Sequence, residues 1–349
     1  MSARASGGMP VPGLRPMLAK AVASVPDDEP GRWLFEPKWD GFRCLLFKNG
    51  NEVVLGSRSD KELTRYFPEL VAAAIQDLPE QCVLDGEIVV ADHDRLSWES
   101  LSARVHPAAS RVELLSNQTP ASFVAFDLLG LSGISLLDAP LSERKRQLHS
   151  LVPAWTSGSF TASVDTQDAS VAREWFELFE GAGLDGVVAK ELTSLYSPDK
   201  RTMLKVKHKR SADVVLLGYR LHTSSTPEAP AVGSLLLGLY DDDGELHMVG
   251  GASAFTSVRR RELVDELAEL VSGSGGGEKN RWNSGKDTSF VTLRPERVCE
   301  VGYDQLQGQR FRHTVSFMRW RPDRDPASCR FDQLDVPANY SLDAVMRRG

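Results

Sequence analysis

Residues 36–58 read EPKWDGFRCLLFKNGNEVVLGSR, and this stretch decides the fold of the first half of the chain. Two apolar runs flank Asn49-Gly50, a dipeptide that is typical of a two-residue β-turn. The pattern therefore predicts a β-hairpin. A lysine, Lys38, stands before the hairpin between a proline and a tryptophan, which is an unusual place for a surface cation.

Further strands and helices surround this hairpin in the sequence. Pro68 predicts the start of a helix, and Gly181 or Gly183 predicts the end of another. The expected helices cover residues 68–78 and 170–183, and the expected strands cover residues 81–92, 121–130, 184–190 and 203–209. The first half thus mixes strands and helices.

The second half has a different texture. Short strands are expected at residues 213–220, 233–251, 297–306 and 313–321, with one helix at 257–271 and a flexible glycine-rich loop at 272–277. Five or so short strands with one helix suit a small β-barrel such as the oligonucleotide-binding (OB) fold. We place the boundary near Ser211, which gives domains 1–211 and 212–349.

Composition excludes several classes of protein. A chain of 349 residues with 41% hydrophobic residues is not disordered, and it has no apolar run long enough to span a membrane. Its first residues lack the apolar core of a signal peptide. Four widely spaced cysteines suggest neither a zinc site nor a disulfide framework. We therefore expect reduced thiols in a cytosolic protein.

The distribution of charge leaves room for local phosphate binding. A net charge of −7 argues against a general nucleic-acid coat, but cations cluster at residues 205–210 and 310–324. Taken alone, each of these two clusters of cations is most simply interpreted as a group of solvent-exposed side chains.

Lys38 has two interpretations when its neighbours alone are considered. It is either a surface lysine before a turn or a nucleophilic amine, which attacks only when it is deprotonated. Taken by itself, the motif KWDGFR favours the surface lysine, because a pattern this short is common by chance.

Three other stretches place polar groups in apolar strands. Asp85 and Glu87 stand two apart and so share a strand face, where buried carboxylates usually meet a cation, a metal or a ligand hydroxyl. Lys205 and Lys207 also share a face, which fits a polyphosphate better than a core. Phe126, taken alone, is a plain core residue.

In order, these stretches resemble the motif series of the covalent nucleotidyltransferases, which include ATP-dependent DNA ligases, RNA ligases and mRNA capping enzymes. The matching stretches are KWDGFR, SRSDKEL, DGEI, FDLL, LDGVVAK, LKVK and RWRPDRDP. Any single motif is weak, whereas seven in order at workable spacing are specific. The chain is most similar to the small stand-alone ligases of the actinobacterial ligase C type, and PMLA at 16–19 resembles the start of their catalytic core.

The resemblance implies an α+β fold, with a nucleotidyltransferase (adenylation) domain of antiparallel sheets and helices followed by an OB-fold barrel. It also implies a set of roles. Lys38 is the residue that becomes adenylated. The residues expected to bind ATP or AMP are Glu36, Arg43, Arg58, Glu87, Phe126, Arg201, Lys205 and Lys207, with Glu87 on the ribose and Phe126 on adenine. Asp185 and Glu87 are expected to hold Mg²⁺ or Mn²⁺, and Arg319, Arg321, Asp323 and Arg324 to orient pyrophosphate.

Two positions depart from the family pattern. Asp185 stands where the family usually has Glu, and Arg324 stands where it usually has Lys. The shorter Asp185 suits a metal contact through water, which fits the hydration that magnesium retains. Arg324 keeps the charge but replaces an ammonium with a planar guanidinium.

The resemblance implies an ATP-dependent DNA ligase that seals nicks in duplex DNA. An RNA ligase, a GTP-dependent mRNA capping guanylyltransferase and a non-catalytic DNA-binding relative stay open as alternatives. We expect a monomer in the bacterial cytosol, with the nucleoid, and no membrane partner. We also expect no additional DNA-binding, polymerase or nuclease domain, so that separate repair polymerases or end-binding proteins would be the further partners.

Overall fold

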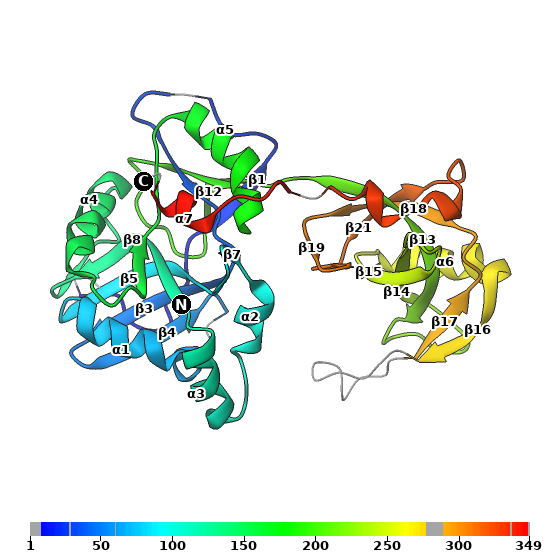
Figure 1. Cartoon of the computed structure of the whole chain (residues 1–349), viewed down its shortest axis with the longest axis horizontal. Helices are drawn as coiled ribbons and strands as arrows, with labels where there is room; N and C mark the ends of the chain where they lie inside the picture. The colour runs from blue at the N-terminus through cyan, green and yellow to red at the C-terminus, as the bar shows by residue number, and fades with distance from the viewer. Residues whose placement is uncertain (1–7, 28, 60, 277–288, 336, 348–349) are drawn as a thin grey trace. The chain divides into compact units, whose positions relative to one another are not determined.

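The computed structural model describes residues 8–27, 29–59, 61–276, 289–335 and 337–347 (Figure 1). These residues form two compact units. The first unit comprises the chain through Lys207 together with the segment from Pro337, and the second comprises His208–Val336. The chain thus leaves the first unit close to the boundary expected after residue 211. Its final segment was expected in the second domain but packs with the first.

A six-stranded sheet forms one layer of the first unit. Its central strands are long and buried, so their apolar runs lack the alternation of a half-exposed strand. The expected hairpin is confirmed, with a positive φ of 60° at Gly50 in its turn. The strands, in spatial order, are β10 (Phe160–Ala162), β8 (Ser122–Leu131), β5 (Gln81–Val89), β3 (Phe42–Asn49) and β4 (Glu52–Ser57), with β9 (Ile134–Ser135) paired to β8.

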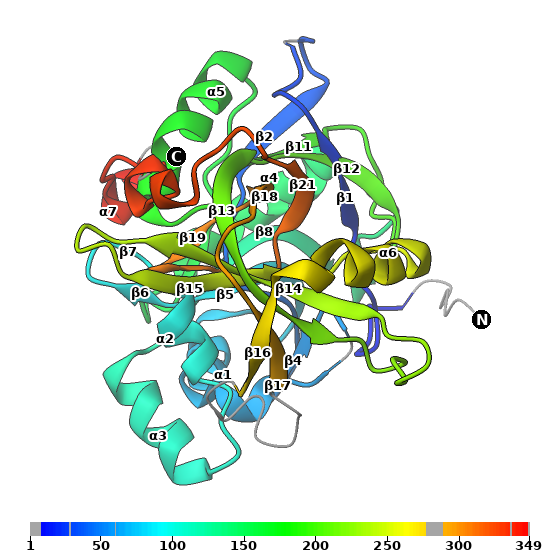
Figure 2. The same ribbon diagram turned by 90° about the vertical axis from the view of Figure 1, so that its right-hand side faces the viewer.

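A four-stranded sheet forms the second layer of this unit. Its order is β1 (Leu18–Val22), β12 (Arg201–Val206), β11 (Val187–Glu191) and β2 (Trp33–Pro37). β1 pairs with β12 in parallel (Figure 2). The segment that precedes β1 therefore lies beside the start of β12, where the N–H of Leu18 donates to the carbonyl of Lys200 at 2.8 Å. A two-stranded ribbon, β6 (Ala91–Asp92) with β7 (Arg95–Leu96), adds to the unit.

Helices cover the two sheets. The helix expected from Pro68 is confirmed as α1, and the helix expected at 170–183 ends at Gly183, whose φ is 89°. The helices of this unit are α1 (Pro68–Asp77), α2 (Trp98–Ala103), α3 (Ala109–Gln118), α4 (Leu141–Leu151), α5 (Ala169–Leu178) and α7 (Leu342–Arg347), with 3-10 turns η1 (Thr64–Tyr66), η2 (Val152–Ala154) and η3 (Phe179–Ala182).

The C-terminal segment is an integral part of the first unit. Val345 on α7 is fully buried, and the ring of Tyr340 lies 5.5 Å from that of Phe179. The backbone N–H of Leu342 donates to the carbonyl of Asp94 at 2.9 Å. Figure 1 shows α7, in red, among the elements of the first unit. Burial of these apolar side chains explains why the last residues leave the second unit.

The second unit is a curled antiparallel sheet, as expected of the OB fold. The long strand β13 pairs with β14 along one edge and with β18 and β17 along the other. The strands are β13 (Arg210–Leu221), β14 (Val232–Tyr240), β15 (Leu246–Ala252), β16 (Val271–Gly276), β17 (Ser289–Leu293), β18 (Val298–Tyr303) and β21 (Ser316–Trp320), with a small hairpin of β19 (Leu306–Gln307) and β20 (Arg310–Phe311). The other elements are α6 (Ser257–Leu267), η4 (Ala268–Leu270), η5 (Pro326–Ser328) and η6 (Phe331–Gln333).

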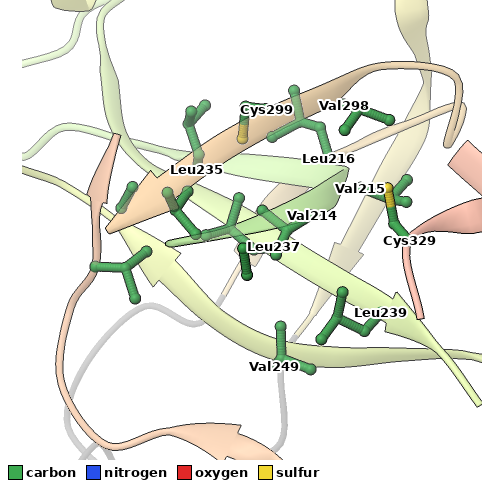
Figure 3. Packing of buried hydrophobic residues seen from close by; sticks show 14 of the residues in the cluster. Val214, Val215, Leu216, Leu235, Leu237, Leu239, Val249, Val298, Cys299 and Cys329 are labelled. Carbon is green, nitrogen blue, oxygen red and sulfur yellow. The ribbon is translucent and has the colours of Figure 1, made fainter. Parts of the chain in front are cut away.

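The core of the second unit is apolar. Leu216, Leu235 and Leu237 lie inside the curl of the sheet, and Cys299 and Cys329 pack with them (Figure 3). The prediction of a flexible loop at 272–277 is wrong for residues 272–276, which belong to β16. Residue 277 lies outside the described residues. A β-carbon on Gly275 would meet the Phe290 ring at 2.7 Å, so the ring fills the space that the glycine leaves. Tertiary packing here overrides a low strand propensity.

None of the described helices is long and apolar enough to cross a membrane. All four cysteines are buried and unpaired, as the sequence predicts.

Candidate active site

The backbone around Lys38 is fixed by the four-stranded sheet. Lys38 follows β2 directly, its N–H donates to the carbonyl of Gly186 at 2.8 Å, and its carbonyl accepts from the N–H of Asp185 at 2.9 Å. Gly186 has a φ of 110°, and a β-carbon there would lie 2.0 Å from the carbonyl oxygen of Val206. A glycine is therefore required where the two loops approach each other.

The side chain of Lys38 meets a carboxylate. Its Nζ lies 2.7 Å from Oδ2 of Asp185, and Nζ of Lys207 lies 2.7 Å from the same oxygen. Burial opposes the charge on Asp185, but the two ammonium groups outweigh it and lower the pKa of Asp185 below its ordinary value. The carboxylate thus stays ionised and orients the amine.

Lys205 adds a third ammonium group. Burial lowers the pKa of Lys205, and the charges of Lys207 and Lys38 lower it further. A cluster of cations that repel one another is stabilised by an anion, and two of its members, Lys38 and Lys205, line a pocket. The arrangement suits a bound phosphate chain.

Glu87 stands on β5 at the edge of the same pocket. The backbone N–H of Gly41 donates to its Oε1 at 3.1 Å. Burial raises the pKa of Glu87 to about 7, although the charges of Arg43 and Lys38 oppose the rise. A carboxylate with this pKa is a good acceptor for a ligand hydroxyl or a ligand for a cation, since either contact would stabilise its charge.

Arg43 and Phe126 form one wall of the pocket. Arg43 is held by Asp85, whose two oxygens accept from Nε and Nη2 at 2.6 Å each. The Arg43 guanidinium lies 4.3 Å from the centre of the Phe126 ring. Burial alone would lower the pKa of Arg43, but Asp85 more than offsets it, so the pKa is raised.

The pocket collects side chains from both sheets of the first unit. Of the residues predicted to bind nucleotide or to react, seven line it: Glu36, Lys38, Arg43, Arg58, Glu87, Phe126 and Lys205. Glu36 forms part of the pocket wall. Its two carboxylate oxygens already bind Lys145 and Lys190, at 2.8 and 2.5 Å. Lys207 reaches the same region through Asp185.

Other predicted residues lie elsewhere. Arg201 is exposed, and its Nη1 donates to the carbonyl of Ala19 at 3.2 Å, outside the pocket lining. The predicted pyrophosphate residues belong to the second unit. There Arg321 binds Asp213 at 2.9 Å and Asp323 at 2.8 Å, Arg324 lies 3.6 Å from Asp213, and Arg319 binds Glu300 at 2.7 Å.

Sequence reasoning missed several pocket residues. Met17, Val188 and Met203 line the pocket beside Trp39, whose Nε1 donates to Ser163 at 2.8 Å. Apolar residues of this kind carry no chemical signal in a sequence. The stretch PMLA could be recognised by its resemblance to the family. Its position at the pocket follows only from the parallel pairing of β1 with β12.

Comparisons with known proteins agree with this geometry. A family model described as "ATP dependent DNA ligase domain" matches residues 16–207, and one described as "ATP dependent DNA ligase C terminal region" matches residues 228–324. "DNA ligase C1" of Mycolicibacterium smegmatis is 53% identical over 348 residues, which cover 96% of this chain and 97% of that protein. "DNA ligase C" of Mycobacterium tuberculosis is 49% identical over 359 residues, which cover 96% and 98%.

Solved structures show the same fold. A structure described as a structure-function analysis of Lig E DNA ligases aligns with a TM-score of 0.58 and 16% identity, covering 88% of this chain and 99% of that one. Since one family model covers more than half of the chain and the relatives match nearly all of it, the chain belongs to the ATP-dependent DNA ligases.

Proposed function

We propose that this protein seals nicks in duplex DNA in three steps, with Lys38 as the nucleophile that carries AMP. The observation that carries the proposal is the position of Lys38. Its amine lies 2.7 Å from Asp185, beside a pocket that three cationic side chains and Glu87 line or adjoin. The family membership supplies the reaction class.

The first step forms a phosphoamide. The deprotonated Nζ of Lys38 attacks the α-phosphorus of ATP, a P–N bond forms, and the bond to the bridging oxygen breaks, so that pyrophosphate leaves. The ammonium must first lose a proton to solvent, while Oδ2 of Asp185, which stays ionised, orients the amine at 2.7 Å. Phosphoryl-type transfer of this kind depends mainly on positioning and charge neutralisation.

The pocket residues then have distinct roles. Lys205 and Lys207 neutralise the α-phosphate. Glu87 accepts hydrogen bonds from the ribose, and Phe126 stacks on adenine while Arg43 fixes the ring from one side. Arg58 also lines the pocket, and among the described residues no ion pair fixes it, so we expect it to reach the ribose or the DNA 5′-phosphate.

The donor set fits a hydrated divalent cation. Both lysines contact Oδ2 of Asp185, and carboxylate oxygens are the protein ligands that Mg²⁺ prefers. Asp185 and Glu87 would hold the ion, through water at the shorter Asp185. When bound, Mg²⁺ or Mn²⁺ supplies charge neutralisation for the triphosphate.

Two further steps complete sealing. The 5′-phosphate oxygen of the nick attacks the AMP phosphorus, the P–N bond breaks, and Lys38 regains its amine. The 3′-hydroxyl then attacks the 5′-phosphorus, and AMP leaves. Arg319, Arg321, Asp323 and Arg324 act in the first step only, by orienting pyrophosphate. The protein acts as a monomer in the bacterial cytosol, with nicked DNA as substrate and separate repair proteins as partners.

Mass spectrometry of the purified protein tests the proposal. Incubation with ATP and magnesium should add one AMP, and Lys38→Ala should abolish both the adduct and nick sealing. Lys38→Arg is the matched control for charge, since its guanidinium stays protonated and cannot attack. A GMP adduct formed from GTP alone, an adduct on Lys38→Ala, or sealing confined to RNA nicks would contradict the proposal.

A further inference from the structure

Tyr196 occupies a buried position between the two sheets of the first unit. It lies in the loop between β11 and β12, and only 5% of its surface is exposed. Its hydroxyl donates to Oδ2 of Asp85 at 2.6 Å and accepts from the backbone N–H of Met17 at 3.2 Å. Burial and the neighbouring Asp85 raise the pKa of Tyr196, so the hydroxyl keeps its proton and acts as a donor.

The contact with Asp85 continues to the pocket. Asp85 is fully buried and binds Arg43 through both oxygens, and Arg43 lies over the ring of Phe126. An unbroken series of contacts therefore runs from Met17 through Tyr196 and Asp85 to Arg43 and Phe126. Because the Arg43 guanidinium is bound on two sides, its position depends on the carboxylate that Tyr196 helps to fix.

The two ends of this series line the pocket, whereas its middle does not. Met17, Arg43 and Phe126 are pocket residues, and Tyr196 and Asp85 lie behind them. Met17 directly precedes β1 of the four-stranded sheet, and Asp85 lies on β5 of the six-stranded sheet. One hydroxyl thus bridges the two layers that form opposite walls of the pocket.

We propose that Tyr196 is a positioning residue for the nucleotide: its hydroxyl sets the spacing between the PMLA segment and the Arg43–Phe126 wall, and thereby the affinity for ATP. This proposal rests on the proposed function of the same pocket. Removal of the hydroxyl leaves the N–H of Met17 without its acceptor and takes one donor from a buried carboxylate, so both walls relax.

Tyr196→Phe tests the proposal with little change of volume. We expect the KM for ATP in lysyl–AMP formation to rise about tenfold, as for the loss of a hydrogen bond to a charged group, with kcat changed less than about threefold. Tyr66→Phe is the matched control, because the Tyr66 hydroxyl also has a side-chain donor, Arg65 at 2.6 Å, but lies outside the pocket lining. The control should keep the wild-type KM.

A double-mutant cycle with Arg43→Lys shows whether Tyr196 acts through Arg43. In that background the effect of Tyr196→Phe on KM should shrink, since lysine cannot make the two-pronged contact with Asp85. An unchanged KM in a folded Tyr196→Phe protein, a loss confined to kcat, or full additivity with Arg43→Lys would overturn the proposal. Absence of lysyl–AMP in the wild-type protein would instead overturn the proposed function.

Discussion

The two units of this ligase differ in what they bury. All of the buried charged side chains among the described residues belong to the first unit, and they include the pairs Arg144–Asp127 and Lys145–Glu36. The core of the second unit consists of apolar side chains and two cysteines. Of its ion pairs, Arg319–Glu300 and Arg321–Asp323 each have one partner that is more than 60% exposed. Arg321 and Asp213, which also pair, are 19% and 13% exposed.

This difference follows from the work of each unit. A buried charge is expensive unless it is paired, and a paired network holds its members in one arrangement. The first unit therefore presents Lys38, Arg43 and Asp185 already in place before any ligand arrives. The second unit holds Arg321 against Asp213 and keeps Arg319 at the surface, where it can reach a ligand that is not part of its own core.

The largest expected effect is on stability, and it tests whether a buried ion pair of the first unit stabilises the fold more than an exposed ion pair of the second unit. Asp127→Ala should lower the free energy of unfolding by about 3–5 kcal/mol, because it leaves Arg144 buried and unpaired. Glu300→Ala in the second unit removes the partner of an exposed arginine and should cost less than about 1 kcal/mol. Urea-induced unfolding followed by intrinsic fluorescence measures both. Equal losses would mean that the buried pairs carry no special energetic weight.

The next effect concerns the chemistry of the first unit. Asp185→Ala should slow lysyl–AMP formation about 100-fold or more, as for the loss of one preorganised electrostatic contact, and it should raise the magnesium requirement. Asp185→Glu keeps the carboxylate and should be tolerated. The rate is measured by quenched transfer of labelled AMP to the protein over a range of magnesium concentrations. An equally inactive Glu variant would show that side-chain length at this position is critical.

A smaller effect is expected in the second unit. Asp323→Ala or Arg324→Ala should slow lysyl–AMP formation about tenfold, which is 1.4 kcal/mol of barrier, and should leave sealing of a pre-adenylated nick unchanged. Arg330→Ala is the matched control, since Arg330 pairs with Asp242 at the surface outside this motif. If the pre-adenylated nick also fails to be sealed, these residues act on DNA or on the fold instead.

A pH dependence is also expected within the first unit. The pKa of Glu87 is raised to about 7 in the fold, against 4.5 without it, so folding takes up a proton between these values. The contribution of Glu87 to stability is complete below pH 4.5 and is lost as the pH rises through about 7, with a total of about 3 kcal/mol. Glu87→Gln should lack this part of the pH profile of unfolding. If the free energies of unfolding of the wild-type protein and of Glu87→Gln differ by an amount that does not vary with pH, this prediction is contradicted.

Much of the local structure could be predicted from the sequence. The hairpin around Gly50 and the helix from Pro68 depend on short-range signals, and both are confirmed. The charged motif residues around the pocket could also be predicted, because charged side chains are easily recognised within apolar strands. The glycine-rich β16 could not be predicted, because its stability depends on Phe290 across the sheet.

The parts of the site that escaped prediction depend on contacts between distant segments. Met203 and Val188 are ordinary apolar residues until β11 and β12 bring them to the pocket. Tyr196 shows no chemical pattern in its loop, and its role follows only from the carboxylate that lies 111 positions away. The place of α7 was missed for a related reason, since six residues carry too short a pattern to identify the unit they pack against.

The return of the C-terminal segment has a consequence for the order of synthesis. Translation completes both sheets of the first unit at residue 206, but Val345 and Tyr340 arrive only after the whole second unit has left the ribosome. Until then Phe179 has Trp175 as an aromatic neighbour but lacks Tyr340. The surface at Gly181, which lies too close to Ala338 for any side chain, is open to water. The first unit is therefore synthesised first but completed last. A ribosome that stalls within the second unit releases a chain whose first unit has its nucleotide pocket but lacks the C-terminal segment.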